Sequence, residues 1–282
     1  MWSIPKDQGL QFYDGPQIMG IINLTPDSFY SPSRANTLEQ ALQQALAMVE
    51  AGASILDLGG HSTRPGAEQI SLQEELDRVI PILEAVKKAL PETLISVDTY
   101  RLEVAKAAWQ AGAHLWNDVG AGNLDAGIFE WLAQSHMPYV LSHSRGQYSA
   151  LHQVPDYGNV LEAVWMDLNE KFLALKALGH HEVWMDPGFG FSKNIAQNYT
   201  LLAHLEQFKH WQRPLLVGLS RKSMIWKLLE ISPEESLPAS SALHLLAFMK
   251  GADVLRVHDV KEAKQVLQLY QTLQGHGLSN LT

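Results

Sequence analysis

Residues 94–98 read Leu-Ile-Ser-Val-Asp, a short apolar run that ends in a carboxylate. Apolar runs of this length without strict alternation suit strands that are buried on both faces of a parallel sheet. Seven further runs of the same kind recur along the 282 residues, each with a polar residue at or next to its end. They are Met19–Asn23, Ser54–Leu58, His114–Asp118, Tyr139–His143, Glu182–Asp186, Leu215–Ser220 and Asp253–His258.

The segments between these runs carry helix signals. Thr37, Ser71 and Asp259 each stand three residues before a Glu or Gln, which is the capping-box spacing at the start of a helix. An apolar stripe at helical spacing follows each of them. Pro81 lies inside the second of these segments, and we expect it to kink or split that helix.

Eight strand–helix units in one chain of this length predict an α/β fold, a closed (β/α)8 TIM barrel over residues 18–282. The alternative is an open doubly wound sheet. That fold usually shows a G-x-G-x-x-G turn after its first strand, whereas Leu24-Thr25-Pro26 follows here. No linker rich in Pro, Ser or Gly divides the chain, so we expect a single domain. Residues 1–17 form an N-terminal extension, expected to be a short hairpin over the barrel floor.

Composition excludes several classes of partner and site. The formal net charge is −9, and no Lys/Arg-rich run stands out, which argues against nucleic acid and anionic membranes as partners. Cysteine is absent, so there is neither a disulfide framework nor a thiolate zinc site. No apolar run reaches membrane-span length, and the first 17 residues do not resemble a signal peptide. The expected compartment is the cytoplasm.

Polar residues at the ends of the runs are candidates for a site, because barrel enzymes carry their chemistry at the carboxyl ends of the strands. A single Asp there is often only the cap of the next helix. Eight polar ends that converge on one mouth, with carboxylates, amides and cations together, favour a binding site instead. They are Asn23, Asp57, Asp98, Asn117-Asp118, His143, Asp186, Ser220-Arg221-Lys222 and Arg256-Val257-His258.

The loops and the last two strands add a second signal. Asn23–Phe29 and Gly59–Gly66 are longer than minimal turns between strand and helix, which indicates lids or anion clamps. Ser220–Ser223 directly precedes a helical run, and a helix N-terminus beside Lys and Ser favours an anion. Arg256 and His258 share one strand face near the usual phosphate site of barrels.

Seven segments resemble the signature motifs of dihydropteroate synthases, in the family's order and with similar spacing. One such motif would be weak, but seven in order are highly specific. They are Asn23–Phe29, Gly59–Gly66, Ser96–Thr99, Asn117-Asp118, Asp186–Phe191, Ser220–Ser223 and Arg256–Asp259.

The resemblance implies a monofunctional, bacterial-type transferase of folate biosynthesis and a target of sulfonamides. Such an enzyme condenses 6-hydroxymethyl-7,8-dihydropterin diphosphate with 4-aminobenzoate, giving 7,8-dihydropteroate and diphosphate. The reaction is a substitution at the pterin methylene carbon in which diphosphate leaves first, so no protein nucleophile is required. The resemblance also implies Mg²⁺ as cofactor and a homodimer.

Site residues follow from the same resemblance. Catalytic roles fall on Asp98, Lys222, Asp27 and Arg64. The pterin pocket would use Asp98, Asn117, Asp186 and Lys222. The diphosphate would meet Arg256, His258 and Arg64, with Mg²⁺ held partly by Asn23. The 4-aminobenzoate would lie by Phe29, Thr63, Pro65, Lys222 and Ser223, and Phe191 is a further substrate-binding candidate.

Several positions depart from the family's pattern. Tyr30–Ser33 replaces a glycine-rich stretch, His61 stands where Glu is usual, and Ser142 and Ser144 flank His143 where the family is more apolar. We expect the first loop to be pre-organised and the enzyme to be active. One alternative is an inactive or specialised pterin-binding paralogue. Another is a pterin-dependent methyltransferase, which would need an acceptor such as a corrinoid protein; the cobalamin-binding D-x-H-x-x-G pattern is absent.

Overall fold

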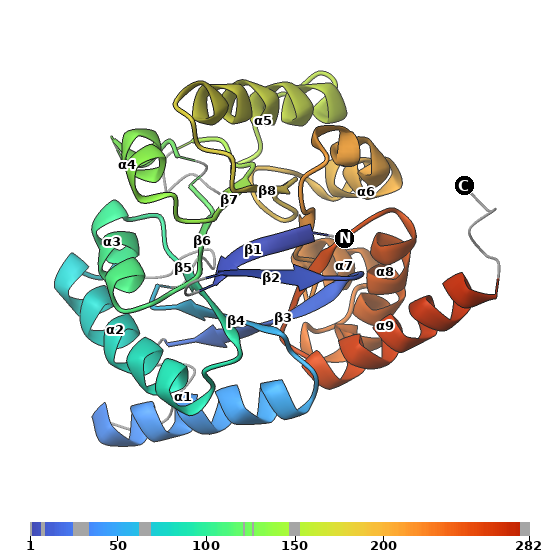
Figure 1. The fold of residues 1–282 in the computed structure, drawn as a ribbon. Coiled ribbons are helices and arrows are strands. Elements are labelled where there is room, and N and C mark those ends of the chain that lie inside the picture. The colour runs from blue at the N-terminus through green and yellow to red at the C-terminus, as the bar shows by residue number, and fades with distance from the viewer. Residues whose placement is uncertain are drawn as a thin grey trace.

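The structure, a computed structural model, describes residues 2–6, 9–24, 34–61, 69–120, 122–125, 127–146 and 153–276. Within these residues eight parallel strands surround a central axis, and helices form a ring outside them (Figure 1). The strands are β3 (Gln17–Asn23), β4 (Ile55–Gly59), β5 (Leu94–Asp98), β6 (Leu115–Asp118), β7 (Tyr139–Ser142), β8 (Val183–Asp186), β9 (Leu216–Val217) and β10 (Val254–Val257).

Neighbouring strands pair in the order β8-β7-β6-β5-β4-β3-β10-β9. The two ends of this sheet meet through a parallel bridge between Met185 and Leu215, and the Met185 N–H donates to the carbonyl of Pro214 at 2.8 Å. The sheet is therefore nearly closed, and the predicted TIM barrel is confirmed. Each strand lies in or overlaps one of the eight apolar runs.

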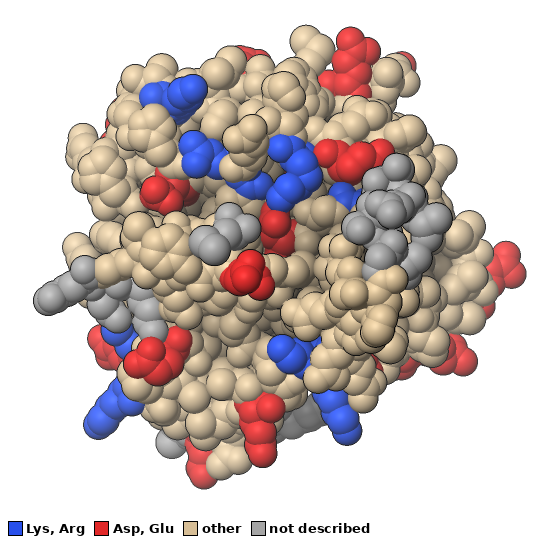
Figure 2. Space-filling view, turned by 45° about the vertical axis from the view of Figure 1, so that its right-hand side comes forward, with Lys and Arg blue, Asp and Glu red and all other residues tan. Residues whose placement is uncertain are grey.

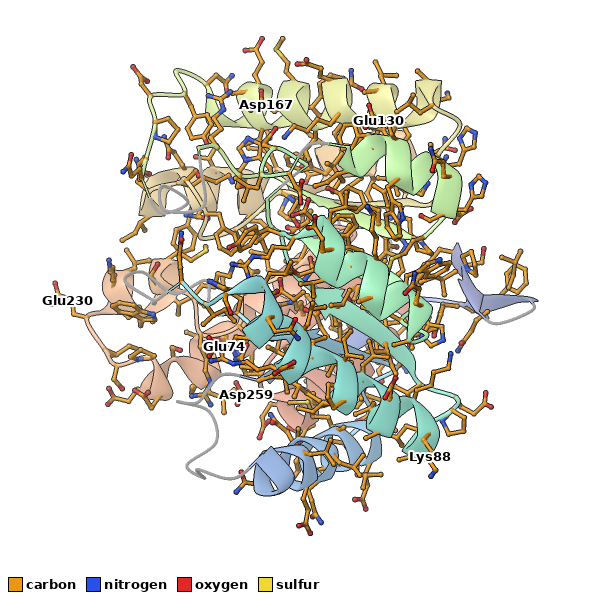
Figure 3. The ribbon with its side chains drawn as sticks, turned by 90° about the vertical axis from the view of Figure 1, so that its left-hand side faces the viewer. Glu74, Lys88, Glu130, Asp167, Glu230 and Asp259 are labelled. Atoms are coloured by element: carbon orange, nitrogen blue, oxygen red, sulfur yellow. The ribbon has the colours of Figure 1, made fainter. Side chains whose placement is uncertain are left out.

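The surrounding helices return the chain from the carboxyl end of each strand to the opposite end. Figure 3 shows this for the second helix, whose first turn carries Glu74 and whose last turn carries Lys88. The helices are α1 (Arg34–Glu50), α2 (Leu72–Ala89), α3 (Leu102–Gln110), α4 (Ile128–Ser135), α5 (Val160–Ala177), α6 (Ile195–Ala203), α7 (Ser223–Leu229), α8 (Leu237–Met249) and α9 (Val260–Gly275), with short 3-10 helices η3 (Leu205–Trp211) and η4 (Glu234–Ser236).

The expected helix starts are confirmed in part. Ser71 caps α2 and accepts the N–H of Glu74 at 3.2 Å. Thr37 was wrong as a cap, because α1 begins at Arg34. Asp259 stands at the cap position of α9, but its side chain makes no cap hydrogen bond. Pro81 does not split α2, which buries its opposite face against the barrel, and this packing outweighs the lost backbone hydrogen bond.

An N-terminal hairpin closes the floor of the barrel, as predicted. It pairs β1 (Trp2–Lys6) with β2 (Gly9–Tyr13) and lies across the barrel in Figure 1. Trp2 stacks on Tyr13 at 4.4 Å between ring centroids and meets Trp184 edge-on at 4.9 Å. One buried cluster joins two hairpin residues to one residue from every barrel strand: Ile4, Tyr13, Met19, Ile55, Leu94, Leu115, Val140, Trp184, Leu216 and Val254.

This floor layer fixes the direction of the side chains above it. Alternate residues of a strand point to the same face, so the residue two places after each floor residue also points into the barrel. On β4, Ile55 is followed in this way by Asp57, and on β10 Val254 is followed by Arg256. The outward residues between them, such as Leu56 and Leu255, belong to the apolar layer under the helices.

The surface carries both signs of charge. On the face in Figure 2, a short run of basic side chains is bordered by acidic ones. Two ion pairs illustrate the mixture. Lys250 Nζ lies 3.0 Å from Glu206 Oε2, and the ammonium of Lys209 contacts the carboxylate of Asp253. Within the described ranges, no helix combines the length and the apolar character that crossing a membrane requires.

The shared floor layer gives a test of what the hairpin contributes. Ile4 is 1% exposed, so Ile4→Ala should lower the free energy of unfolding by about 2–5 kcal/mol through lost burial and a new cavity. Leu10→Ala is the matched control, because Leu10 lies on the same hairpin and is 56% exposed. Its change should stay within about 0.5 kcal/mol. Urea unfolding measures both, and equal changes would contradict the role of Ile4 in the floor.

Candidate active site

A layer of polar side chains lies directly above the apolar floor. Its members are the six polar residues among the inward positions that come two places after the floor residues; at the same positions β3 has Ile21 and β9 is followed by Gly218. Five of them are at most 8% exposed, and the sixth, Arg256, is half-buried. They are Asp57, Ser96, Asn117, Ser142, Asp186 and Arg256.

Arg256 joins two carboxylates across the barrel. Its Nε donates to Asp57 Oδ2 and its second guanidinium nitrogen to Asp98 Oδ2, each at 2.5 Å. Burial raises the pKa of Asp98 to about 7, although the charge of Arg256 opposes the shift. Burial also disfavours the charged form of Arg256, but the two carboxylates raise its pKa above the ordinary value. The guanidinium therefore stays charged while Asp98 can exchange a proton near neutral pH.

Asp57 organises this part of the layer; sequence reasoning named it among the eight polar strand ends but gave it no ligand or catalytic role. Its Oδ2 accepts hydrogen bonds from Arg256 and from Asn117 Nδ2, the latter at 3.0 Å. Its Oδ1 is buried and has no hydrogen-bond partner among the described residues. Its spacing from Ile55 is the sequence signal that places both side chains inside the barrel.

Asp186 and Lys222 meet at the loop that follows β8. Asp186 Oδ1 accepts the N–H of Gly188 at 2.8 Å, and Oδ2 accepts the hydroxyl of Ser142 at 3.1 Å. Lys222 donates to the carbonyl of Phe189, and its Nζ lies 4.3 Å from the ring centroid of Phe191. Burial lowers the pKa of Lys222 to about 8, although the charge of Asp186 opposes the shift.

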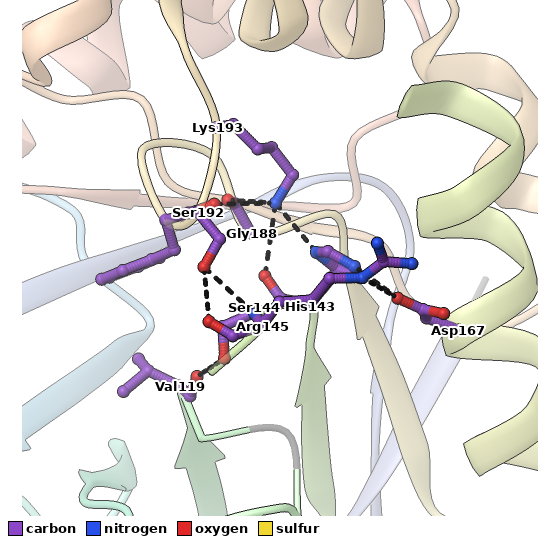
Figure 4. Close-up of polar contacts among 9 residues, drawn as sticks. Val119, His143, Ser144, Arg145, Asp167, Gly188, Ser192 and Lys193 are labelled. Atoms are coloured by element: carbon purple, nitrogen blue, oxygen red, sulfur yellow. Dashed lines mark hydrogen bonds and ion pairs between the residues drawn. The ribbon is translucent and has the colours of Figure 1, made fainter. Parts of the chain in front are cut away.

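A buried lysine holds the same loop from behind (Figure 4). Lys193 Nζ lies 2.9 Å from His143 Nδ1, 2.9 Å from the carbonyl of Gly188 and 3.0 Å from that of Phe191. Burial lowers the pKa of Lys193 to about 7, although the charge of Asp186 opposes the shift. In its ammonium form Lys193 only donates, so His143 then accepts at Nδ1 and donates from Nε2 to Asp167 at 3.1 Å. Burial lowers the pKa of His143 to about 4, which agrees with a neutral ring. His143 thus supports the loop, and the sequence analysis did not single out Lys193.

Asp118 turns away from the barrel axis. It follows Trp116, which lies in the outer apolar layer, and it accepts the hydroxyl of Tyr139 at 2.6 Å and two backbone N–H groups. Burial raises its pKa. Its role is to fix the loop after β6, while its neighbour Asn117 points inward.

The remaining expected residues stand at the carboxyl ends of the strands or in the loops beyond them. Asn23 ends β3, Ser223 begins α7, and His258 follows β10 with its Nδ1 3.2 Å from Ser220 Oγ. The structure thus links Asn117 to Arg256 through Asp57, and Arg256 in turn to Asp98. Lys222, which precedes α7, contacts the loop that follows Asp186. Five expected residues lie outside the described ranges: Asp27, Phe29, Thr63, Arg64 and Pro65.

Comparisons with known proteins agree with this geometry. Residues 19–258 match the family described as pterin binding enzyme. The chain is 42% identical to dihydropteroate synthase of Escherichia coli K12, over 91% of each chain. The structure superposes on Yersinia pestis dihydropteroate synthase in complex with a sulfonamide drug, with a TM-score of 0.89, 39% identity and coverage of 97% of this chain and 100% of that one. For the Xanthomonas albilineans enzyme in complex with 7,8-dihydropteroate, the TM-score is 0.86, the identity 37% and the coverage 96% and 98%.

A parallel barrel whose inner polar layer opens at the carboxyl ends of its strands defines a barrel enzyme with its site at that mouth. Together with the match over residues 19–258, this places the protein among the enzymes that bind pterins. The chain belongs to the dihydropteroate synthase family of transferases.

The buried lysine behind the loop can be tested without any ligand. Lys193→Met removes the ammonium that binds the carbonyls of Gly188 and Phe191, and buried unpaired groups cost about 1–3 kcal/mol each. We expect a lower free energy of unfolding and faster amide exchange in residues 187–193. Lys88→Met, at the exposed end of α2, is the matched control and should change neither. Unchanged exchange in the Lys193 variant would contradict the supporting role.

Proposed function

We propose that this chain condenses 6-hydroxymethyl-7,8-dihydropterin diphosphate with 4-aminobenzoate to 7,8-dihydropteroate and diphosphate. The observation that carries the proposal is the inner polar layer, which sets carboxylates, an amide and a cation at one depth of a barrel. We further propose a homodimer in the cytoplasm, as the family resemblance and the composition favour.

The pterin would bind against the inner layer through Asn117 and Asp186, and through Asp98, which follows the inner-layer residue Ser96 by two places on β5. One edge of a pterin is a lactam next to an amino-pyrimidine, which is a fixed row of hydrogen-bond donors and acceptors. Buried carboxylates and an amide can pair with such a row, and an analogue that lacks one member leaves a buried group unpaired. Lys222, packed over the ring of Phe191, would close the pocket on the side of the β8 loop.

The diphosphate would bind at the mouth above Arg256 and His258. Arg256 already balances two carboxylates, so the leaving group would compete with Asp98 for the same guanidinium. Mg²⁺ would neutralise part of the diphosphate charge, with Asn23 as a ligand. An amide oxygen suits that ion, which keeps waters and takes few protein ligands.

The reaction is a substitution at the pterin methylene carbon. The bond between this carbon and the diphosphate oxygen breaks first, and the diphosphate takes the electron pair. The amine nitrogen of 4-aminobenzoate then bonds to the carbon and releases a proton. Asp98, in its ionised form, would stabilise the positive charge that develops on the pterin. Burial of this carboxylate strengthens the interaction, because little water screens it.

The 4-aminobenzoate would lie nearer the mouth, by Lys222 and Ser223. Phe29, Thr63 and Pro65 are proposed there too, and Asp27 and Arg64 are proposed to complete the catalytic set; all five lie outside the described residues.

The decisive experiment is a turnover assay with the pterin diphosphate, 4-aminobenzoate and Mg²⁺, in which release of diphosphate and formation of 7,8-dihydropteroate are both measured. We expect both products in equal amounts. A chain that binds the pterin but releases no diphosphate would contradict the proposal and favour the inactive paralogue. A variant with Tyr30–Ser33 replaced by glycines would then show whether that segment is the cause.

The pH dependence of kcat/KM should be bell-shaped. Activity should fall below pH about 7, where Asp98 becomes protonated and loses its charge, and above pH about 8, where Lys222 becomes neutral. The substrates titrate as well, so the comparison with Asp98→Asn is needed. That variant should be slower and should lack the acidic limb that belongs to Asp98. An identical acidic limb in both proteins would show that the limb arises from another group.

The diphosphate site can be separated from the pterin pocket by Arg256→Ala. Loss of a charge-assisted hydrogen bond costs about 1.5–3 kcal/mol, so affinity for the pterin diphosphate should fall roughly ten- to hundredfold. Affinity for the free pterin should fall less. His258→Ala, which leaves the buried carboxylates paired, should act in the same direction. Arg145→Ala is the control, since Arg145 pairs with Asp167 instead. Calorimetry that finds equal losses for both ligands would contradict the assignment.

A further inference from the structure

Strand β7 contributes one buried hydroxyl to the inner layer, and none of the roles above uses it for a ligand. Ser142 is 1% exposed and follows Val140, a floor residue, by two places, so its side chain points into the barrel. Its Oγ lies 3.1 Å from Oδ2 of Asp186 on the neighbouring strand. Residues 142 and 186 are also paired in the register of β7 and β8, which fixes their side chains next to each other.

In this pair the oxygen of Ser142 can still accept a hydrogen bond. A carboxylate only accepts, so the single hydroxyl proton of Ser142 is committed to Asp186. The hydroxyl oxygen keeps its lone pairs. On the carboxylate, Oδ1 is held by the N–H of Gly188 and Oδ2 by Ser142, so both oxygens are fixed by donors from two different segments. The pair therefore offers two acceptor atoms, Asp186 Oδ2 and Ser142 Oγ, about one hydrogen-bond length apart.

We propose that Ser142 is a specificity-determining residue of the pterin pocket. It orients the carboxylate of Asp186 and presents its own oxygen as a second acceptor to the same edge of the ring. Two adjacent acceptors select a ring edge with two adjacent N–H donors, as in the ring N–H and exocyclic amino group of a 2-amino-4-oxopyrimidine. This inference rests on the proposed function and refines it, since it names the part of the pterin ring that Ser142 and Asp186 bind.

The chain itself provides a matched control two residues away. Ser144 is also a buried serine beyond the same strand, 3% exposed, but its hydroxyl donates to the backbone carbonyl of Val119 at 2.6 Å (Figure 4). Ser144→Ala thus removes a serine hydroxyl and one hydrogen bond without changing Asp186. Any effect that Ser142→Ala has beyond that of Ser144→Ala belongs to the contact with Asp186 or to the acceptor that Ser142 itself presents.

The test is calorimetric binding of two ligands, 6-hydroxymethylpterin and its analogue without the 2-amino group, to the full chain. The wild type should prefer the amino-bearing ligand. In Ser142→Ala we expect affinity for that ligand to fall roughly tenfold and affinity for the analogue to change little, so the preference shrinks. Ser144→Ala should leave the preference unchanged, and Ser142→Thr, which keeps the hydroxyl, should retain it.

Two results would overturn the inference. Equal losses for both ligands in Ser142→Ala would show that the hydroxyl acts only by orienting Asp186 or supporting the fold and does not bind the 2-amino group. An unchanged preference would show that Ser142 does not discriminate between the two ligands. Failure of the proposed function is visible separately, in a wild type that binds neither ligand and forms no 7,8-dihydropteroate. A wild type that turns over while Ser142→Ala keeps the full preference would remove the role of Ser142 and leave the enzyme's function intact.

Discussion

Side chains along a strand alternate between its two faces, and in a closed barrel one of these faces always points to the axis. In this protein the alternation puts an apolar residue from every strand on the floor and, two places later, the polar residues of the site. The side chains of the layer above keep their positions only if the floor below them is dry and well packed. The hairpin completes this packing with Ile4 and Trp2. The position of the site is thus a consequence of how the floor is filled.

The inner layer is expensive to form, because it takes several charges out of water. The structure offsets this cost by pairing: Arg256 neutralises Asp57 and Asp98, while backbone and hydroxyl donors satisfy Asp186. The balance is incomplete at Asp98, which follows the layer residue Ser96 on β5 and whose pKa burial still raises to about 7. An anion that the protein barely stabilises by itself is well suited to stabilise a cation that develops on a bound ligand. The incomplete neutralisation of Asp98 by Arg256 is thus a cost to the fold and an advantage for the proposed chemistry.

Much of this arrangement could be predicted from the sequence, and the reasons differ from residue to residue. The barrel followed from apolar runs such as Leu94–Asp98, because strands buried on both faces have a distinctive composition. Lys193 could not be found in that way, since its role depends on a histidine 50 residues earlier in the chain. Thr37 was wrongly predicted as a helix cap: its spacing to a glutamine fits a capping box, but the helix already starts at Arg34. Local spacing predicts strands and their faces well, whereas contacts between loops depend on the closed fold.

Serine side chains connect the loops on one side of the mouth. Ser144 binds the loop after β6, and Ser192 exchanges hydrogen bonds with the backbone of Arg145 at 3.1 and 2.9 Å. Ser192 has a φ of 51°, a left-handed conformation that costs a non-glycine residue about 1–2 kcal/mol. The two hydrogen bonds offset that cost. The wall around Asp186 is consequently held in place by donors from its own neighbours. A ligand that binds there meets acceptors already oriented, so little of its binding energy is lost in ordering the protein.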